Sequence, residues 1–166
     1  MNGRALLPEF DQEMTGTRRV LERVPFEHRD FRPHARSWTL LELATHLANL
    51  PVWLPLTLEK EELDLEVPMP SPLPPADSPE LLNRFDGNVD RARAALEGAT
   101  PAALEAGWTL RRGEMVVFAL PRIAVVRSMI LNHMIHHRGQ LTVYLRMTGA
   151  PVPGLYGRSA DENAQS

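Results

Sequence analysis

Cysteine is absent from the 166-residue chain. This absence excludes a disulfide framework, a thiolate metal ligand and a cysteine nucleophile, so histidines and carboxylates are the strong metal ligands that remain. No apolar run approaches the roughly eighteen residues that a membrane span needs. The N-terminal residues reach Pro8, Glu9 and Asp11 without the apolar segment of a secretory signal. We therefore expect a cytoplasmic protein with no membrane partner.

An excess of positive charge is also missing, because the formal net charge is -3 at pH 7. The overall field of such a chain does not hold it to nucleic acid, and Arg111, Arg112 and Arg122 are only scattered arginines. The hydrophobic and charged fractions, 43% and 23%, are typical of a soluble globular protein. Because the length suits one hydrophobic core, we predict a single domain over residues 1–166.

Two amphipathic helices are predicted in the first third of the chain. Apolar residues recur at three- and four-residue steps over 8–24. Thr39 and Glu42 have the capping-box spacing that begins a second helix. Pro51 removes a backbone donor, so we expect this second helix to break near Leu50.

Two further helices are predicted beyond a long, proline-rich connector over 60–77. Ser78 as the cap and Pro79 in the first turn begin the third helix, which ends at Gly98. The fourth helix covers 122–148 and is about 40 Å long at 1.5 Å per residue. A connector of this length is unusual inside a compact domain, and a crossover that makes the second and third helices parallel would account for it.

These segments predict an all-α fold, namely a four-helix bundle with an up-down-down-up course and a long crossover from helix 2 to helix 3. Thr100 precedes a short helical turn in this interpretation. Two small apolar groups over 108–120 suggest a β-hairpin. The tail over 151–166 is expected to contain turns and to end in polar residues.

Three of the six histidines lie in the fourth predicted helix. At 100° per residue, His133 and His137 are only about 40° apart, in the middle of the core-facing arc, whereas His136 lies toward its flank. Two imidazoles at this spacing can grip one divalent metal ion. Met134 follows His133, so the His-Glu-x-x-His motif of zinc peptidases is absent.

A third metal ligand has to come from another segment, and His46 is the candidate because it lies in the apolar stripe of the second helix. Three inward imidazoles without a common partner would be costly, since an unsatisfied buried polar group costs about 1–3 kcal/mol. The alternative stays open that each histidine is satisfied by a neighbouring carbonyl or carboxylate. Glu42, one turn before His46, is explained equally well as a hydrogen-bond acceptor or as a cap. His28 and His34 are expected at the surface.

The C-terminal third contains a recognisable run of residues: His133-Met-Ile-His136-His137-Arg138-Gly139-Gln140-Leu141, Tyr144-Leu145-Arg146, Gly149, Val152-Pro153 and Tyr156-Gly-Arg-Ser159-Ala-Asp161-Glu162. Upstream, Ser37-Trp38-Thr39 is followed by His46-Leu47. Together these elements resemble the DinB family of DinB/YfiT-like metalloenzymes. Between residues 60 and 120 only the arrangement of the elements matches.

This resemblance implies a four-helix bundle and a divalent metal ion held by three histidines. Carried over by position, these ligands are His46, His133 and His137, and zinc and nickel are the ions that we expect. Some relatives are transferases or isomerases that use low-molecular-weight thiols, and relatives are often homodimers. The family name reflects the DNA-damage induction of a founding member, so it implies a stress response rather than DNA binding.

Other residues near the three histidines receive predicted roles. Gln140 and Tyr144 lie close to the ligand arc and are candidates for lining a substrate or cofactor pocket, although core packing explains Tyr144 equally well. Arg138 and Arg146 project away from that arc and are expected in solvated or interhelical ion pairs. Trp38 is expected to anchor packing at the start of the second helix.

A metal ion held by three histidines keeps a coordination position open, as in catalytic zinc sites. Such an ion lowers the pKa of bound water to about 7 or stabilises a thiolate. We therefore predict a metal-dependent enzyme, either a thiol-dependent transferase or isomerase or a hydrolase, acting on a small-molecule substrate. The alternative is a non-enzymatic metal-binding protein of a stress response. A homodimer face is predicted on the flank of the fourth helix, at Val125, Met129, Val143 and Met147.

Overall fold

The computed structural model describes residues 2–69 and 73–163. Its long helical segments are α1 (Leu7–Leu21), α2 (Leu40–Asn49) followed by α3 (Trp53–Glu59), α4 (Ser78–Gly98), and α6 (Arg122–Val125) continued by the π-helix η4 (Val126–Asn132) and α7 (His133–Met147). The short helices are η1 (Gly3–Leu6), η2 (Phe26–His28), η3 (Leu50–Val52), α5 (Pro101–Glu105) and α8 (Ala160–Asn163). Pro70 and Pro72 of the predicted connector and the last three residues of the tail lie outside the described residues.

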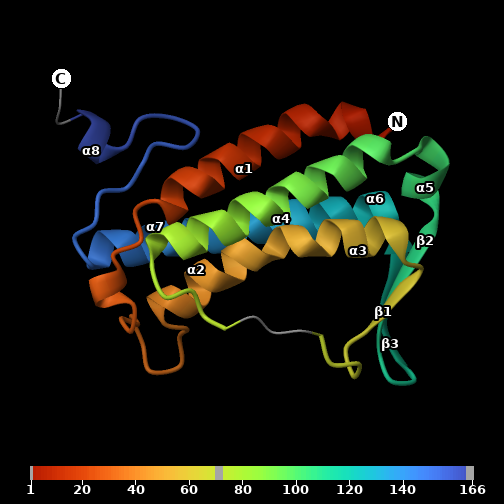
Figure 1. Ribbon diagram of the computed structural model, residues 1–166, viewed down its shortest axis with the longest axis horizontal. Helices are drawn as coiled ribbons and strands as arrows, with labels where there is room; N and C mark the ends of the chain where they lie inside the picture. Colours follow the sequence, from red (N-terminus) through yellow and green to blue (C-terminus); the bar gives the residue numbers. More distant parts are fainter. Residues whose placement is uncertain (1, 70–72, 164–166) are drawn as a thin grey trace.

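The long helical segments lie side by side (Figure 1). The chain runs along α1, returns along α2 and α3, runs in that second direction again along α4, and returns along α6, η4 and α7. Both α1 and α2 contact α4 and α7. Buried side chains such as Phe10, Leu43, Phe85 and Leu141 therefore form one hydrophobic cluster between these helices.

The second predicted helix breaks where the sequence indicated. Thr39 and Glu42 form the predicted capping box, because each side chain accepts a hydrogen bond from the other residue's backbone N–H, at 3.1 Å and 2.7 Å. The helix α2 ends at Asn49, and η3 with Pro51 leads into α3. The cap of α4 was predicted one residue too late, since Asp77 rather than Ser78 accepts the N–H of Glu80.

The all-α prediction is wrong, because the chain also forms a three-stranded sheet of order β1-β2-β3. Strands β2 (Gly107–Arg112) and β3 (Met115–Pro121) are the predicted hairpin, paired antiparallel with a bulge near Arg111. Strand β1 (Glu62–Asp64) pairs parallel to β2 and lies within the stretch that was predicted as a connector. Its three residues supply only one buried apolar side chain, Leu63, so local sequence does not reveal it.

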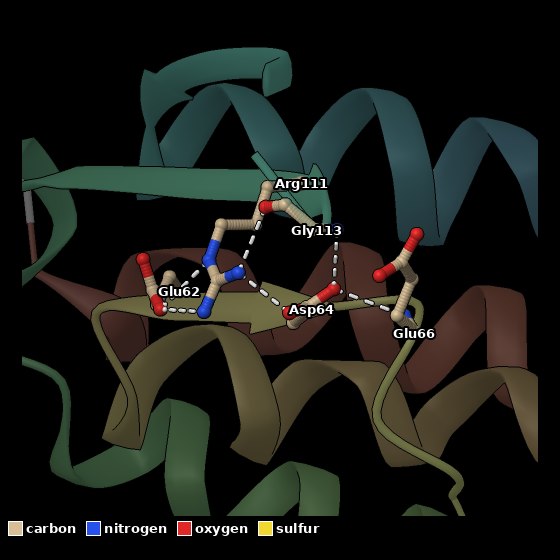
Figure 2. Close-up of polar contacts among 5 residues, drawn as sticks. All are labelled: Glu62, Asp64, Glu66, Arg111 and Gly113. Carbon is tan, nitrogen blue, oxygen red and sulfur yellow. Dashed lines mark hydrogen bonds and ion pairs between the residues drawn. The ribbon is translucent and has the colours of Figure 1, made fainter. Parts of the chain in front are cut away.

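Charge pairing joins β1 to the hairpin (Figure 2). The Arg111 guanidinium donates to Glu62 at 2.8 Å and to Asp64 at 2.5 Å. The other oxygen of Asp64 accepts the backbone N–H of Glu66 and of Gly113, both at 2.9 Å. These two backbone hydrogen bonds, with Arg111 nearby, lower the pKa of the Asp64 carboxyl. Arg111 is therefore engaged within the fold rather than in a basic patch.

The fourth predicted helix is continuous from Arg122 to Met147, but its middle part is the π-helix η4. One residue of the predicted dimer flank is placed wrongly, because Val125 is fully buried in a cluster beneath the sheet. Val143 and Met147 are exposed. None of the described helices combines the length and apolar character that a bilayer span requires.

Candidate metal centre

Three histidine side chains meet between α2 and α7. The Nε2 atom of His133 lies 3.4 Å from that of His46 and 2.8 Å from that of His137. One ligand atom from each of the three residues lies within 4.8 Å of the others. The predicted convergence of His46 with the helical pair is confirmed. His136 is exposed, and its ring centroid lies 4.9 Å from that of His137, outside this group.

The carbonyl of Met129, a residue of the π-helix η4, lies against the His133 ring. At the junction with α7, the backbone N–H of His133 bonds to the carbonyl of Ile130, three residues back. The carbonyl of Met129, the usual acceptor in an α-helix, lies 3.3 Å from Nδ1 of the His133 ring. A carbonyl can only accept, so this contact favours the tautomer with the proton on Nδ1 and the lone pair on Nε2. Short π-helical stretches within α-helices often occur at functional sites.

Gln140 orients the His137 ring in the same way. Its Oε1 accepts a hydrogen bond from Nδ1 of His137 at 2.7 Å, from one turn further along α7. Nε2 of His137 is then also free to accept. The spacing of three residues between His137 and Gln140 is visible in the sequence, but sequence reasoning assigned Gln140 only to a pocket wall.

The chemistry of this donor set fits a divalent cation. With both Nδ1 atoms donating, the Nε2 atoms of His133 and His137 are two acceptors only 2.8 Å apart, which a shared cation would relieve. Tetrahedral zinc with Zn–N bonds of about 2.0–2.1 Å separates its ligand nitrogens by roughly 3.4 Å. The distance between His46 and His133 agrees with this separation, at 3.4 Å.

Burial keeps the imidazoles in the form that binds metal. Loss of hydration, together with the neighbouring His137 and His133, lowers the pKa of His46 to about 4. Burial also lowers the pKa of His137, against the opposing effect of its hydrogen bond to Gln140. Neutral imidazole is the metal-binding form, so His46 and His137 are ready to accept an ion at neutral pH.

Trp38 covers the histidines from outside the helices. Its ring stacks on His137 with centroids 5.4 Å apart at 27°, and it lies 5.0 Å from the ring of His46. Trp38 was predicted to anchor packing at the start of the second helix, but the residue is 46% exposed and its ring packs on the histidines instead. Its backbone is held by the core, since the hydroxyl of Tyr144 donates to the Trp38 carbonyl at 3.1 Å. The buried Tyr144 ring also packs edge-on against Phe31.

Two cavities reach this group of histidines from either side of Trp38. The smaller has a volume of about 430 Å³ and is lined by Pro33, Arg36, Ser37, Trp38, Leu43, His137, Gln140, Val143 and Tyr144. The larger has a volume of about 840 Å³, and its lining includes Arg29, Asp30, Arg32, Trp38, Glu42, Thr45, His46 and Asn49. Each cavity therefore exposes a different histidine of the group, His137 or His46, to a small molecule.

The two arginines of α7, Arg138 and Arg146, form ion pairs with other segments of the chain. Arg138 is buried and forms an ion pair with Glu13 of α1 at 2.6 Å, so the predicted interhelical pair is present and is not solvated. Arg146 forms a more exposed pair with Asp161. His28 and His34 lie at the surface, as predicted.

Comparisons with known proteins identify a family for this architecture. The model of the DinB family matches residues 1–166. The DinB-like protein YjoA of Bacillus subtilis superimposes with a TM-score of 0.72 at 18% identity, over 93% of this chain and 98% of that chain. A DinB-like protein of Bacillus cereus ATCC 10987 gives a TM-score of 0.70 at 24% identity, over 92% and 97%. The uncharacterized protein YrdA of Bacillus subtilis (strain 168) is 47% identical over 36 residues, which are 22% of each protein.

Proposed function

The chain belongs to the DinB family, and on this basis we propose that it is a metal-dependent enzyme that acts on a small molecule. Its scaffold is a single four-helix-bundle domain, and its ligands are His46, His133 and His137. The observation that carries this proposal is that one ring nitrogen from each of the three histidines lies within 4.8 Å of the other two, beside two cavities.

A divalent ion held by three imidazoles, with zinc and nickel as the candidates, would supply Lewis acidity that favours the ionised form of a water or thiol at neutral pH. The residues of the chain prepare this site. Met129 and Gln140 contact the Nδ1 atoms of His133 and His137, respectively. The Nε2 atoms of the same two rings therefore face each other. The Trp38 ring shields the imidazoles from bulk water on the side where it stacks.

Two cavities at one metal site favour a reaction between two small molecules over simple hydrolysis. A low-molecular-weight thiol is the nucleophile that we propose, and an electrophilic small molecule is its partner. The polar side chains of the larger cavity suit a hydrophilic thiol, and the mainly apolar wall of the smaller cavity suits the electrophile.

Alanine variants of the histidines test the metal site. We expect His46→Ala, His133→Ala and His137→Ala each to lower the metal content of untagged protein by at least about tenfold, because each removes one of three ligands. His136→Ala is the matched control and keeps its metal. Elemental analysis that finds His136 essential and His137 dispensable would contradict this ligand set.

A thiol titration of cobalt-substituted protein tests the enzymatic role. A shift of the visible spectrum on addition of thiols is expected, because the fourth position is open to exchange. Saturable metal binding with no response to thiols or azide would instead assign the protein to the non-enzymatic, metal-binding class.

A further inference from the structure

The smaller cavity has a mainly apolar wall and a single charge. Pro33, Trp38, Leu43, Val143 and Tyr144 supply its apolar surface. Arg36 is the one permanently charged residue among those that line it, and its other polar residues, the ligand His137 aside, are the neutral Ser37 and Gln140. A volume of about 430 Å³ is within the range of small-molecule sites, about 300–1,000 Å³.

The charge of Arg36 is not neutralised by the protein. Within residues 2–69 and 73–163, no carboxylate lies within ion-pair distance of its guanidinium, and its recorded hydrogen bond is made by its backbone N–H, to His34. Other arginines of the chain do pair with acids, for example Arg18 with Asp86 and Arg93 with Asp11. An unpaired guanidinium beside an apolar surface is a ready partner for a carboxylate, which it can bind through two parallel hydrogen bonds.

The larger cavity provides the contrast. Its two arginines are accompanied by two acids, since Arg29 lies 3.8 Å from Asp30 and Arg32 acts electrostatically on Glu42. Its lining is therefore close to neutral. The two cavities at the histidine group differ in charge, and only the smaller one carries a net positive charge.

We propose that the smaller cavity binds the small-molecule substrate of this site as a carboxylate with an apolar body. Arg36 pairs with the carboxylate, and the apolar body packs between Trp38 and Val143. The body then lies next to His137, which brings the uncharged part of the ligand toward the histidine group. This inference rests on the proposed function, because it assigns a substrate class to that site.

Phenylacetate and its neutral analogue phenylacetamide are suitable probes. Metal-free protein is titrated first, so that the carboxylate has no ion to bind, and zinc-loaded protein second. The NMR signal of the Trp38 indole, identified by its loss in Trp38→Phe, reports a ligand in either cavity, because Trp38 lines both, and the arginine variants then identify the cavity that is occupied. We expect phenylacetate to shift this signal saturably in both forms and to bind at least about fivefold more tightly than phenylacetamide.

Two matched variants test which arginine binds the carboxylate of the probe. Arg36→Gln is expected to weaken phenylacetate binding at least about fivefold and to leave phenylacetamide unchanged. Arg32→Gln removes the same charge from the other cavity and should change both affinities less than twofold. Both arginines are exposed, so the variants are expected to fold as the parent does.

The possible results separate this inference from the proposed function. Equal binding of the two probes, equal effects of the two variants, binding only in the zinc-loaded form, or no binding would each overturn the carboxylate site. None of these results changes the metal content or the response of cobalt to thiols. Conversely, intact Arg36-dependent binding in a protein that takes up no zinc when the ion is supplied would refute the proposed function alone.

Discussion

The ion pair between Glu13 of α1 and Arg138 of α7 lies inside the protein, one residue from His137 of the proposed metal site. The side chains are only 8% and 2% exposed, and the closest oxygen and nitrogen are 2.6 Å apart. The guanidinium also donates to the Glu13 carbonyl and to the Tyr156 hydroxyl, which in turn donates to the Glu13 carboxylate at 2.8 Å. The absence of a side chain at Gly16 provides space for the guanidinium, since a Cβ there would lie 2.9 Å from Nη1 of Arg138.

Removing one partner should be far more harmful than removing both. Glu13→Leu leaves a buried guanidinium without its counter-charge, for which a loss of about 3–5 kcal/mol in the free energy of unfolding is expected. Arg138→Met leaves a buried carboxylate and should cost a similar amount. Since natural domains are stable by about 5–15 kcal/mol, each single variant loses a large part of the total. The double variant Glu13→Leu with Arg138→Met removes both charges and should recover at least about 2 kcal/mol over either single variant.

Urea denaturation followed by far-UV circular dichroism measures these differences, and a double-mutant cycle isolates the coupling. Tyr156→Phe is the control, because it keeps both charges and removes one hydroxyl, at a cost of about 1 kcal/mol. The reasoning is refuted if Glu13→Leu costs less than about 1 kcal/mol, or if the double variant loses the sum of the two single losses.

Three further predictions concern His46, Gln140 and Asp64. The pKa of His46 in the folded, metal-free protein is about 4, below its ordinary value of 6.5. Between these two pH values, His46 is therefore protonated in the unfolded chain but neutral in the folded protein. Stability should therefore fall as the pH drops from about 6.5 to 4. The loss should be smaller than the roughly 3.4 kcal/mol expected for a fully buried group, because solvent screens this partly exposed ring, and urea titrations of His46→Phe should lack this contribution. Gln140→Leu should weaken zinc binding about 10–100-fold in competition with a chelator, while Gln140→Glu, which still accepts from His137, should bind within about threefold of the parent. Asp64→Asn removes the charge that holds the hairpin turn, so the Gly113 amide should exchange its hydrogen faster, whereas unchanged protection would show that the turn is held by other contacts.

The sequence predicts the helices and the grouping of the three histidines well because both depend largely on local spacing. The capping box at Thr39, the break near Leu50 and the shared face of His133 and His137 follow from residues a few positions apart. The position of His46 in an apolar stripe was enough to propose its convergence with that pair.

The features that were missed depend on contacts between distant segments or on irregular backbone. Strand β1 is specified by Arg111, 49 positions from Glu62. The π-helix η4 has no marker in the sequence, yet it contains Met129, whose carbonyl contacts the His133 ring. Trp38 was predicted to anchor packing at the start of the second helix, because a pattern of residue types does not show that a ring will pack against two imidazoles near the surface.

The central claim is that three imidazoles hold a divalent ion and leave one position to an exchangeable ligand. X-ray absorption spectroscopy of zinc-loaded, untagged protein, before and after addition of a small thiol, tests it most directly. We predict three histidine nitrogens at about 2.0–2.1 Å in both spectra and one new sulfur at about 2.3 Å after the addition. A zinc ion with four protein ligands and no sulfur after the addition, or one with fewer than three histidine ligands, would contradict the account.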